Sequence, residues 1–311
     1  MIGPHKRILV TGGAGFIGSH LTETLRLDRC EVVVLDDLSM GRRENLHEAV
    51  EFHQGDVRDE DALRRALKGV DAVIHLAAKV SVRASTDDFI NDASVNVLGT
   101  LSALKACAGT GVRKFVYASS MAVYADSPEP KPINEDYACR PISPYGVGKL
   151  ASENYVLDIC PRMGVAPVVL RLFNTYGQGQ TFTPYVGVIT IFIRRLLNSE
   201  PPIVFGSGEQ CRDYISVDDA VTACGLALES DCGGQVFNIG TGTPVSVNAL
   251  AEKLCELINP EIKPVHEAER PGELRNCIAD AGKARRMMGY NPLGHVFDQL
   301  EDLIDYHKSL K

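Results

Sequence analysis

Residues 11–18 read T-G-G-A-G-F-I-G and lie between a short apolar run, Ile8–Val10, and a helical pattern that continues through Leu25. The stretch spaces its glycines three residues apart, at Gly12, Gly15 and Gly18. Glycine lets the backbone turn tightly and lets a diphosphate approach it, and the helix start beyond offers free N–H groups and a positive dipole end. Because the glycines fall between strand and helix, the stretch predicts a diphosphate-binding turn in the first unit of a parallel α/β sheet.

The next apolar strand, Glu31–Leu35, ends in two acids, Asp36 and Asp37. A carboxylate at this place suits a hydrogen bond to the ribose 2′-hydroxyl of an adenine dinucleotide and repels a 2′-phosphate. Arg42 and Arg43 follow in the loop and favour a phosphorylated ribose instead, and a polar turn without function is a further alternative. On balance we expect NAD rather than NADP.

Strand and helix patterns alternate through the first 175 residues, with strands at 50–54, 72–76, 114–118 and 166–172 and helices at 60–68, 91–109 and 144–161. Repeated β-α units imply a parallel sheet. We therefore expect a Rossmann-type doubly wound parallel sheet over residues 1–175, with 210–238 returning to it. A smaller, discontinuous α/β domain is expected over residues 176–209 and 239–311. Pro161 should end the last helix of the first part, and Asp218 should cap a helix over 220–228.

Small and polar residues follow the expected strands, at the edge where ligands bind in doubly wound sheets. Asp56 is a candidate contact for adenine or an ordinary turn acid. Ala77 and Ala78 are small enough for a cofactor to pass close to the backbone, and Ser119 and Ser120 end the strand at 114–118. These positions predict a binding edge shared by several strands.

Two further polar residues fall inside apolar patterns. His75 on the strand at 72–76 is better explained as a packed core histidine than as a ligand. Asn96, in the helix over 91–109, either hydrogen-bonds a backbone loop or lies on a solvated face.

Residues 143–149 read S-P-Y-G-V-G-K, where Ser143 can cap a helix and Pro144 suits its first position. Tyr145 and Lys149 are then i and i+4 neighbours on one helical face. A cation beside a phenol lowers the pKa of the phenol, which is how tyrosine serves as a base near neutral pH. Taken alone the spacing is common in surface helices, so its meaning depends on the other motifs.

Composition limits the class of protein. The chain has 311 residues, 45% of them hydrophobic, enough for one large or two smaller domains. A formal net charge of −8 and a sequence pI near 5.5 argue against a nucleic-acid partner. The nine cysteines show no metal-binding spacing, so we expect free thiols, no metal site and a reducing compartment. No apolar run reaches a membrane span and no signal peptide precedes the first strand, so we expect a cytoplasmic protein without a membrane partner.

Motifs along nearly the whole chain resemble, in order, those of the extended short-chain dehydrogenase/reductases, in the NAD-dependent nucleotide-sugar epimerase/dehydratase family. They are T-G-G-A-G-F-I-G-S-H, L-D-D-L, G-D-V-R-D, H-L-A-A, N-V-x-G-T, S-S-x-A-V-Y, S-P-Y-G-x-x-K, R-x-F-N-x-Y-G, R-D-Y-I-x-V-D-D and R-P-G-E. The sequence is most similar to UDP-galactose 4-epimerase-like proteins. The resemblance implies an enzyme that inverts C4 of a UDP-hexose through a transient 4-keto sugar.

By that resemblance, Tyr145 is the base and acid, Lys149 tunes it, and Ser120 hydrogen-bonds the reacting sugar hydroxyl. Contacts to NAD are expected from Gly12, Gly15, Phe16, Ile17, Gly18, Asp36, Asp37, Asp56, Val57, Leu76, Ala77, Ala78, Asn96, Ser119, Tyr145 and Lys149. Contacts to the nucleotide sugar are expected from Ser120, Tyr145, Asn174, Arg212, Arg270 and Cys277. Arginine suits the diphosphate because its donors pair with phosphate oxygens.

Departures from the family pattern narrow the activity. Dehydratases of this family carry an Asp and a Glu where this chain has Met121 and Ala122, which cannot move a proton. The loop at 178–185 reads Q-G-Q-T-F-T-P-Y and lacks the arginine usual in UDP-glucuronate 4-epimerases. Cys277 falls where some epimerases place a bulky tyrosine, which favours acceptance of N-acetylated sugars.

Three alternatives remain open at this stage. One is a UDP-glucuronate 4-epimerase, the second is another nucleotide-sugar epimerase or 4-keto reductase, and the third is a non-catalytic NAD-binding scaffold. The resemblance also implies a homodimer formed through the helix over 91–109 and the helix that carries Tyr145.

Overall fold

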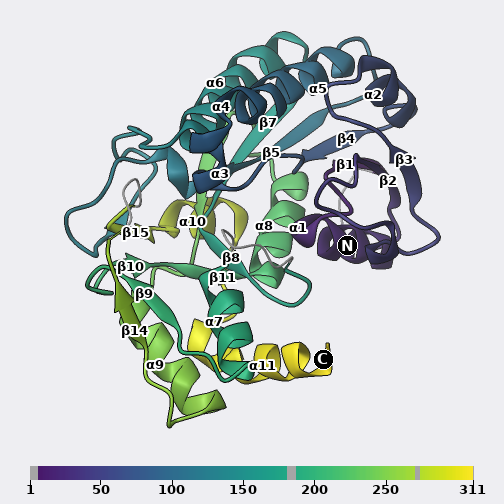
Figure 1. Cartoon of the computed structure of the whole chain (residues 1–311). Helices are drawn as coiled ribbons and strands as arrows, with labels where there is room; N and C mark the ends of the chain where they lie inside the picture. Colours follow the sequence, from purple (N-terminus) through teal and green to yellow (C-terminus); the bar gives the residue numbers. More distant parts are fainter. Residues whose placement is uncertain (1–5, 181–186, 270–273, 311) are drawn as a thin grey trace.

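Seven parallel strands form the central sheet, in the spatial order β3-β2-β1-β4-β5-β7-β12 (Figure 1). The computed structural model describes residues 6–180, 187–269 and 274–310. The strands are β1 (Arg7–Thr11), β2 (Glu31–Asp36), β3 (Glu51–Gln54), β4 (Ala72–His75), β5 (Lys114–Ser120), β7 (Ala166–Leu172) and β12 (Gln235–Ile239). The chain runs outward in opposite directions from β1 and β4, so the expected doubly wound sheet is confirmed, and its switch point lies between these two strands.

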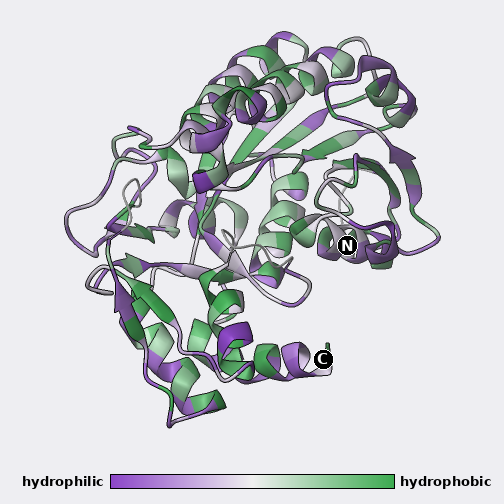
Figure 2. Cartoon of the chain, viewed as in Figure 1, coloured by the Kyte–Doolittle hydropathy of each residue, from purple (hydrophilic) through white to green (hydrophobic). Residues whose placement is uncertain are grey.

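Helices cover both faces of this sheet because successive strand side chains point to opposite sides. Ile8 and Val10 pack on one face and Leu9 packs on the other. The first face carries α1 (Phe16–Leu27), α8 (Val217–Glu229) and α10 (Gly282–Met288), and the second carries α2 (Glu60–Ala66), α5 (Gly99–Cys107) and α6 (Pro144–Arg162). Figure 2 shows hydrophobic residues along the central strands, as a sheet buried on both faces requires.

A second, smaller core lies beside the sheet, in the lower part of Figure 1. It is built from α7 (Val188–Leu197), α9 (Val247–Ile258), η4 (Val296–Gln299) and α11 (Leu300–Ser309). Short strands surround it in three small sheets: β13 (Val245–Ser246), β10 (Cys211–Arg212), β15 (Asn276–Ala279) and β6 (Pro132–Ile133); β11 (Tyr214–Ser216) with β8 (Asn174–Tyr176); and β14 (Val265–Glu267) with β9 (Ile203–Phe205). The sequence predicts that residues 239–311 belong to this smaller domain. Within that range, α10 instead packs against β12 of the main sheet.

The single helix expected over residues 91–109 is divided. It consists of α4 (Phe89–Ala93), a π-helical turn η2 (Ser94–Leu98) and α5, and it follows a short helix α3 (Val82–Asp87) that the sequence did not predict. The Asp88 side chain caps α4 by accepting a hydrogen bond from the Asn91 N–H at 3.1 Å. A π turn inside a helix often marks a functional site.

Two predicted helix boundaries are wrong by a few residues. Pro161 lies inside the last turn of α6, which ends at Arg162. Ser216, and not Asp218, caps α8, because its Oγ accepts a hydrogen bond from the Asp219 N–H at 3.0 Å. Asp218 instead lies in the first turn, where its charge still favours the helix dipole. The remaining short elements are η1 (Arg43–Asn45) and η3 (Met121–Val123).

None of the helices in the described ranges has both the length and the apolar character needed to cross a bilayer.

A buried ion pair ties α6 to the sheet. Arg171 on β7 donates from Nε and Nη2 to the Glu153 carboxylate on α6 at 3.0 and 2.8 Å. Ser119, at the end of β5, donates its hydroxyl to the same carboxylate, and Arg171 also donates to the Tyr124 hydroxyl at 2.8 Å. The Arg171 side chain is 6% exposed and the Glu153 side chain is 2% exposed. Because water does not solvate these charges, the ion pair and the hydrogen bonds must stabilise them.

Replacing one member of this pair should destabilise the fold strongly. We expect Glu153→Gln to lower the free energy of unfolding by about 3–5 kcal/mol, because it leaves the Arg171 guanidinium buried without a counter-charge. Asp158→Asn on the same helix is the matched control, since its pair with Arg162 is exposed, and should cost less than about 0.5 kcal/mol. Urea unfolding of both variants measures the difference, and equal losses would contradict the prediction.

Candidate functional site

A cleft of about 1080 Å³ opens at the carboxyl ends of the central strands. Residues expected from the sequence line the sheet side of this cleft and part of its opposite side. They are Gly12, Gly15, Phe16, Ile17, Gly18, Asp36, Asp37, Asp56, Val57, Leu76, Ala77, Ala78, Ser119, Ser120, Tyr145, Lys149, Asn174 and Arg212. The cleft therefore brings the glycine-rich turn, the strand ends and the Tyr–Lys helix to one place.

The glycine-rich turn has no room for side chains at two of its glycines. Gly12 has φ +71°, and a Cβ there would lie 2.7 Å from the Ala77 nitrogen; a Cβ on Gly18 would lie 2.2 Å from the Gly12 oxygen. Gly15 caps α1 without any side-chain hydrogen bond. The first N–H groups of α1 thus face the cleft without a side-chain acceptor, which fits a diphosphate.

Asp36 lies at the end of β2 and is 6% exposed. Its two carboxylate oxygens accept hydrogen bonds from the Ala14 N–H at 2.9 Å and the Leu38 N–H at 2.8 Å. Burial raises the pKa of Asp36, whereas these two backbone bonds favour the charged form. The carboxylate is held in place on the cleft wall, as a contact to a ribose hydroxyl would require.

Two of the expected polar contacts are engaged within the protein. Arg58 donates from Nε to Asp56 at 2.9 Å, and this ion pair lowers the pKa of Asp56. Ser119 directs its hydroxyl to Glu153, away from the cleft. Both residues border the cleft, but their side-chain groups already have strong partners.

Tyr145 and Lys149 lie on the cleft-facing side of α6, one turn apart, and Ser120 lies opposite them at the end of β5. The Ser143 side chain caps α6 by accepting from the Gly146 N–H at 3.2 Å, which fixes where the helix begins. Lys149 Nζ donates to the Ala118 carbonyl at 2.8 Å and lies 5.9 Å from the centre of the Tyr145 ring. The three side chains thus border the same part of the cleft.

Burial dominates the proton affinity of this group. It raises the pKa of the Tyr145 phenol to about 12, although a hydrogen bond with Ser120 acts in the opposite direction. It lowers the pKa of Lys149 to about 8, against the attraction of Asp92 and Glu153. The Tyr–Lys spacing predicted a lowered tyrosine pKa. In the protein alone, loss of solvent outweighs the neighbouring cation.

His75 and Asn96 have structural roles behind the cleft. Thr11 Oγ1 lies 2.8 Å from His75 Nδ1 and Thr100 Oγ1 lies 3.1 Å from its Nε2. Burial lowers the pKa of His75 to about 3, so the ring is neutral. Asn96 does not line the cleft; it accepts from the Lys79 N–H at 2.9 Å and donates to the Lys79 carbonyl at 3.0 Å. The expectation of a packed histidine is confirmed, and Asn96 holds a backbone loop.

On the opposite side, Asn174 and Arg212 line the cleft, whereas Cys277 does not. Cys277 pairs with Arg212 across β15 and β10 and is 1% exposed, within a small core that also contains Phe173 and Leu274. Cys277 is therefore buried beneath the cleft wall, and its contact with the sugar stays a prediction. Arg270 lies outside the described residues.

Sequence reasoning missed the outer wall of the cleft. This wall comes from α3, α7, β9 and the segments beside them, through Val82, Arg83, Ile191, Phe192, Arg195, Ile203, Phe205, Gln210 and Leu274. The helical pattern at 188–197 predicted an amphipathic helix, but no motif indicates which residues of such a helix contact a ligand. Arg195 is held by Pro201, whose carbonyl accepts from its Nε at 2.7 Å.

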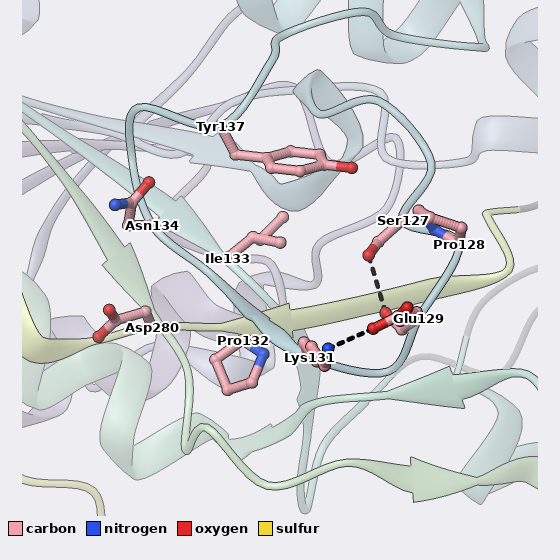
Figure 3. A pocket seen from close by; sticks show the side chains of 9 residues that line it. All are labelled: Ser127, Pro128, Glu129, Lys131, Pro132, Ile133, Asn134, Tyr137 and Asp280. Carbon is pink, nitrogen blue, oxygen red and sulfur yellow. Dashed lines mark hydrogen bonds and ion pairs between the residues drawn. The ribbon is translucent and has the colours of Figure 1, made fainter.

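A second hollow, of about 400 Å³, lies beside β6 (Figure 3). Its lining consists of Ser127, Pro128, Glu129, Lys131, Pro132, Ile133, Asn134, Tyr137 and Asp280. Lys131 pairs with Glu129, and the Ser127 hydroxyl donates to the Glu129 carbonyl at 2.8 Å. None of the expected catalytic residues borders it, so the large cleft is the candidate site.

Known proteins resemble this chain over nearly its whole length. The model of the NAD dependent epimerase/dehydratase family matches residues 8–240. The chain is 37% identical to a UDP-glucose 4-epimerase of Mycolicibacterium smegmatis, over 97% of this chain and 99% of that protein. A UDP-glucose 4-epimerase of Thermotoga maritima, solved with UDP-glucose, superposes with a TM-score of 0.94 at 37% identity, over 98% of this chain and 100% of the other.

Two further solved structures carry other sugars. A UDP-N-acetylglucosamine 4-epimerase of Methanobrevibacter ruminantium, in complex with UDP-N-acetylmuramic acid, has a TM-score of 0.92 at 34% identity, over 98% and 99% of the two chains. A mutant UDP-glucuronic acid 4-epimerase of Bacillus cereus, with a fluorinated UDP-glucuronic acid and NAD, has a TM-score of 0.91 at 31% identity, over 98% and 100%. Similarity of the fold alone thus does not select the sugar.

A substitution at Gly12 tests whether close packing in the glycine-rich turn matters for stability and for NAD binding. We expect Gly12→Ala to lower the free energy of unfolding by more than Gly109→Ala and to weaken NAD binding. Both glycines have positive φ, but a Cβ on Gly109 meets no atom within 4 Å. The control therefore carries only the backbone strain of about 1–2 kcal/mol. Urea unfolding and NAD titration measure both effects, and equal behaviour of the two variants would contradict a role for close packing.

Proposed function

The chain belongs to the NAD dependent epimerase/dehydratase family, and from this premise we propose that it is a 4-epimerase of UDP-hexoses that uses NAD. UDP-glucose and UDP-galactose are the proposed pair. The observation that carries the proposal is the meeting of Ser120, Tyr145 and Lys149 in one cleft with the glycine-rich turn. Residues 1–175 and 210–238 would hold NAD, and residues 176–209 and 239–311 would hold most of the nucleotide sugar.

The proposed mechanism assigns one proton to Tyr145. When bound, NAD would supply a reversible hydride acceptor and a positively charged ring. Tyr145 removes the proton of the C4 hydroxyl and later restores it, and Ser120 hydrogen-bonds that hydroxyl. Because burial raises the pKa of Tyr145 to about 12, the phenolate needs cationic charge near it, and Lys149 is the chain's own source.

The neighbouring residues favour epimerisation over dehydration. Met121 and Ala122 directly follow Ser120, and their side chains carry no group that can donate or accept a proton. Dehydration of a 4-keto sugar needs such groups for the departing water. The keto sugar is therefore left to accept its hydrogen again at C4.

UDP-glucuronic acid is the second candidate substrate, because a structural neighbour acts on it. Arg83 of α3 borders the cleft and would be the candidate partner of a sugar carboxylate, whereas the described part of the 178–185 loop contributes Gln180. The small residue Cys277 no longer supports acceptance of N-acetyl groups directly, since it lies beneath the cleft.

We further propose a homodimer that forms through α4, η2 and α6. Phe89, Ile90, Leu98, Val147 and Tyr155 are large apolar residues on these elements, and all are exposed. Leu98 is 55% exposed and Val147 is 54% exposed. Contiguous exposed apolar surface of this kind is typical of an interface.

The cytoplasm is the proposed location. None of the nine cysteines forms a disulfide in the described residues, and six of them are buried, as expected in a reducing compartment.

Turnover of nucleotide sugars tests the proposed activity. The purified protein with NAD should interconvert UDP-glucose and UDP-galactose without net production of NADH, which chromatography of the nucleotide sugars and absorbance at the NADH band measure. Tyr145→Phe should lower kcat by about 10²–10⁴-fold, because it removes the proton-transfer group. Tyr306→Phe, which does not border the cleft, is the matched control and should retain kcat.

Conversion of UDP-glucuronic acid alone would replace the first proposal by the second. Net NADH consumption with a keto sugar would indicate a reductase, and absence of any turnover by NAD-bound protein would contradict both.

A charge placed on the apolar surface should separate the subunits. We expect Leu98→Glu combined with Val147→Glu to change the mass in solution from about twice 33.8 kDa to the mass of one chain, because burying two glutamates in an apolar contact is costly. Leu293→Glu is the control, since Leu293 is 66% exposed and lies outside these helices. Light scattering after gel filtration measures the masses, and a monomeric unmodified protein would contradict the dimer.

A further inference from the structure

Asp92 is a buried acid that forms no ion pair within the described residues. It lies on α4, immediately before the π turn η2, and is 3% exposed. Neither carboxylate oxygen meets a hydrogen-bond partner within the described residues. Burying an isolated carboxylate costs free energy. Buried acids with a charged neighbour are found more often at functional sites than elsewhere.

Lys149 directly follows the residue of α6 against which Asp92 packs, and each of the two affects the pKa of the other. A Cβ built on Gly148, the residue before Lys149, would lie 3.6 Å from Asp92 Oδ1, so the carboxylate packs directly against this turn of the helix. Burial raises the pKa of Asp92, whereas the Asn96 side chain and the charge of Lys149 act in the opposite direction. In turn, Asp92 and Glu153 raise the pKa of Lys149, which burial lowers to about 8.

Of these two acids, Glu153 already has a counter-charge. It accepts two hydrogen bonds from Arg171, at 3.0 and 2.8 Å, and one from Ser119. Its charge is therefore largely balanced before it acts on Lys149. Asp92 has no such ion pair among the described residues, so its charge acts on Lys149 with little compensation.

Other titratable groups near this pair leave the argument unchanged. Asp88, at the start of α4, raises the pKa of Asp92, and Lys79, in the loop after β4, lowers it, each by less than burial does. His75 is neutral, because burial lowers its pKa to about 3. Burial raises the pKa of Tyr117, whose ring lies 5.0 Å from Lys149 Nζ, so it too is neutral.

We propose that Asp92 is a positioning residue that acts through Lys149: its carboxylate is the counter-charge that keeps the buried ammonium group protonated. The proposal rests on the proposed function, in which a charged Lys149 favours the Tyr145 phenolate. It assigns a role to the contact between α4 and α6, and it gives a reason for a buried acid that has no ion pair among the described residues.

The sign of the expected effect follows from the charges. Removing the negative charge of Asp92 makes the protonated form of Lys149 less favourable, so Lys149 loses its proton at a lower pH. It also lowers the pKa of Tyr145, which Asp92 raises. A pH profile of kcat should therefore shift to lower pH on both limbs, a change that a merely structural residue would not produce.

Direct titration of Lys149 tests the proposal without turnover. Protein labelled with ¹³C at the lysine ε-carbons is titrated by NMR, with and without saturating NAD, and the Lys149 signal is identified by its absence in Lys149→Met. In Asp92→Asn we expect the pKa of Lys149 to fall by about one unit relative to the unmodified protein. An unchanged Lys149 pKa in folded Asp92→Asn would overturn the proposal.

Asp88→Asn is the matched control. It removes the same charge from the same helix at an exposed position and keeps an N-cap residue, so the pKa of Lys149 should change by less than about 0.3 units. Asp92→Ala guards against misfolding of Asp92→Asn, since it removes the charge without leaving a polar group unpaired, and it must shift the Lys149 pKa in the same direction. A shift in Asp88→Asn equal to that in Asp92→Asn would indicate a general field effect and overturn the proposal.

The two proposals fail separately. If the protein shows no epimerase activity, the NMR titration still decides whether Asp92 sets the pKa of Lys149. If it is active and the kcat profile of Asp92→Asn coincides with that of the unmodified protein, the role of Asp92 is overturned while the epimerase function stands.

Discussion

The structure depends on the buried carboxylate of Glu153 more than on any other single group. This carboxylate joins α6 to β7 through Arg171 and to β5 through Ser119. Tyr145 and Lys149 lie on the same helix, two turns and one turn before it, and Ser120 directly follows Ser119. One desolvated ion pair therefore fixes the distance between the helix and the strand end that together form the reactive part of the cleft. A flexible surface contact could not do this, because exposed pairs contribute little and permit many geometries.

Burial has opposite effects on the two groups that share the face of α6. It disfavours the charged form of each, and so it raises the pKa of Tyr145 and lowers the pKa of Lys149. A neutral phenol beside a lysine close to deprotonation would be a poor base. The site therefore requires additional charge, and the chain supplies part of it through Asp92, whose negative charge favours the ammonium form. The bound cofactor, with its positive ring, would supply the remainder.

The inner strands of the central sheet could be predicted from the sequence because they are buried on both faces and contain apolar runs, as in residues 32–35. The two-residue strands could not be predicted, because segments such as Cys211–Arg212 are held by pairing with residues far along the chain. The wall of the cleft that the glycine-rich turn forms could also be predicted, because each glycine in such a turn has a physical reason. The burial of Cys277 could not be predicted, because one aligned position does not specify whether a strand points its side chain into a cleft or into a core. Asp92 was missed because an acid in a helix looks solvated until its burial is known.

Met121 and Ala122, which directly follow Ser120, have structural roles and carry no group that can transfer a proton. Ala122 donates its backbone N–H to Ser120 Oγ at 3.2 Å, so the hydroxyl that faces the cleft is oriented by the turn that follows it. The Met121 sulfur lies 3.6 Å from Asn174 Nδ2, which in turn donates to the Asp213 carbonyl at 3.0 Å. Met121 thus connects the strand end at Ser120 to the side of the cleft that carries Arg212. Acidic side chains at these two positions would place charge beside the keto sugar and provide a path for losing water. With methionine and alanine there, the same backbone geometry orients Ser120 but offers the sugar no second acid or base, and return of hydrogen to C4 is the reaction that the remaining groups can perform.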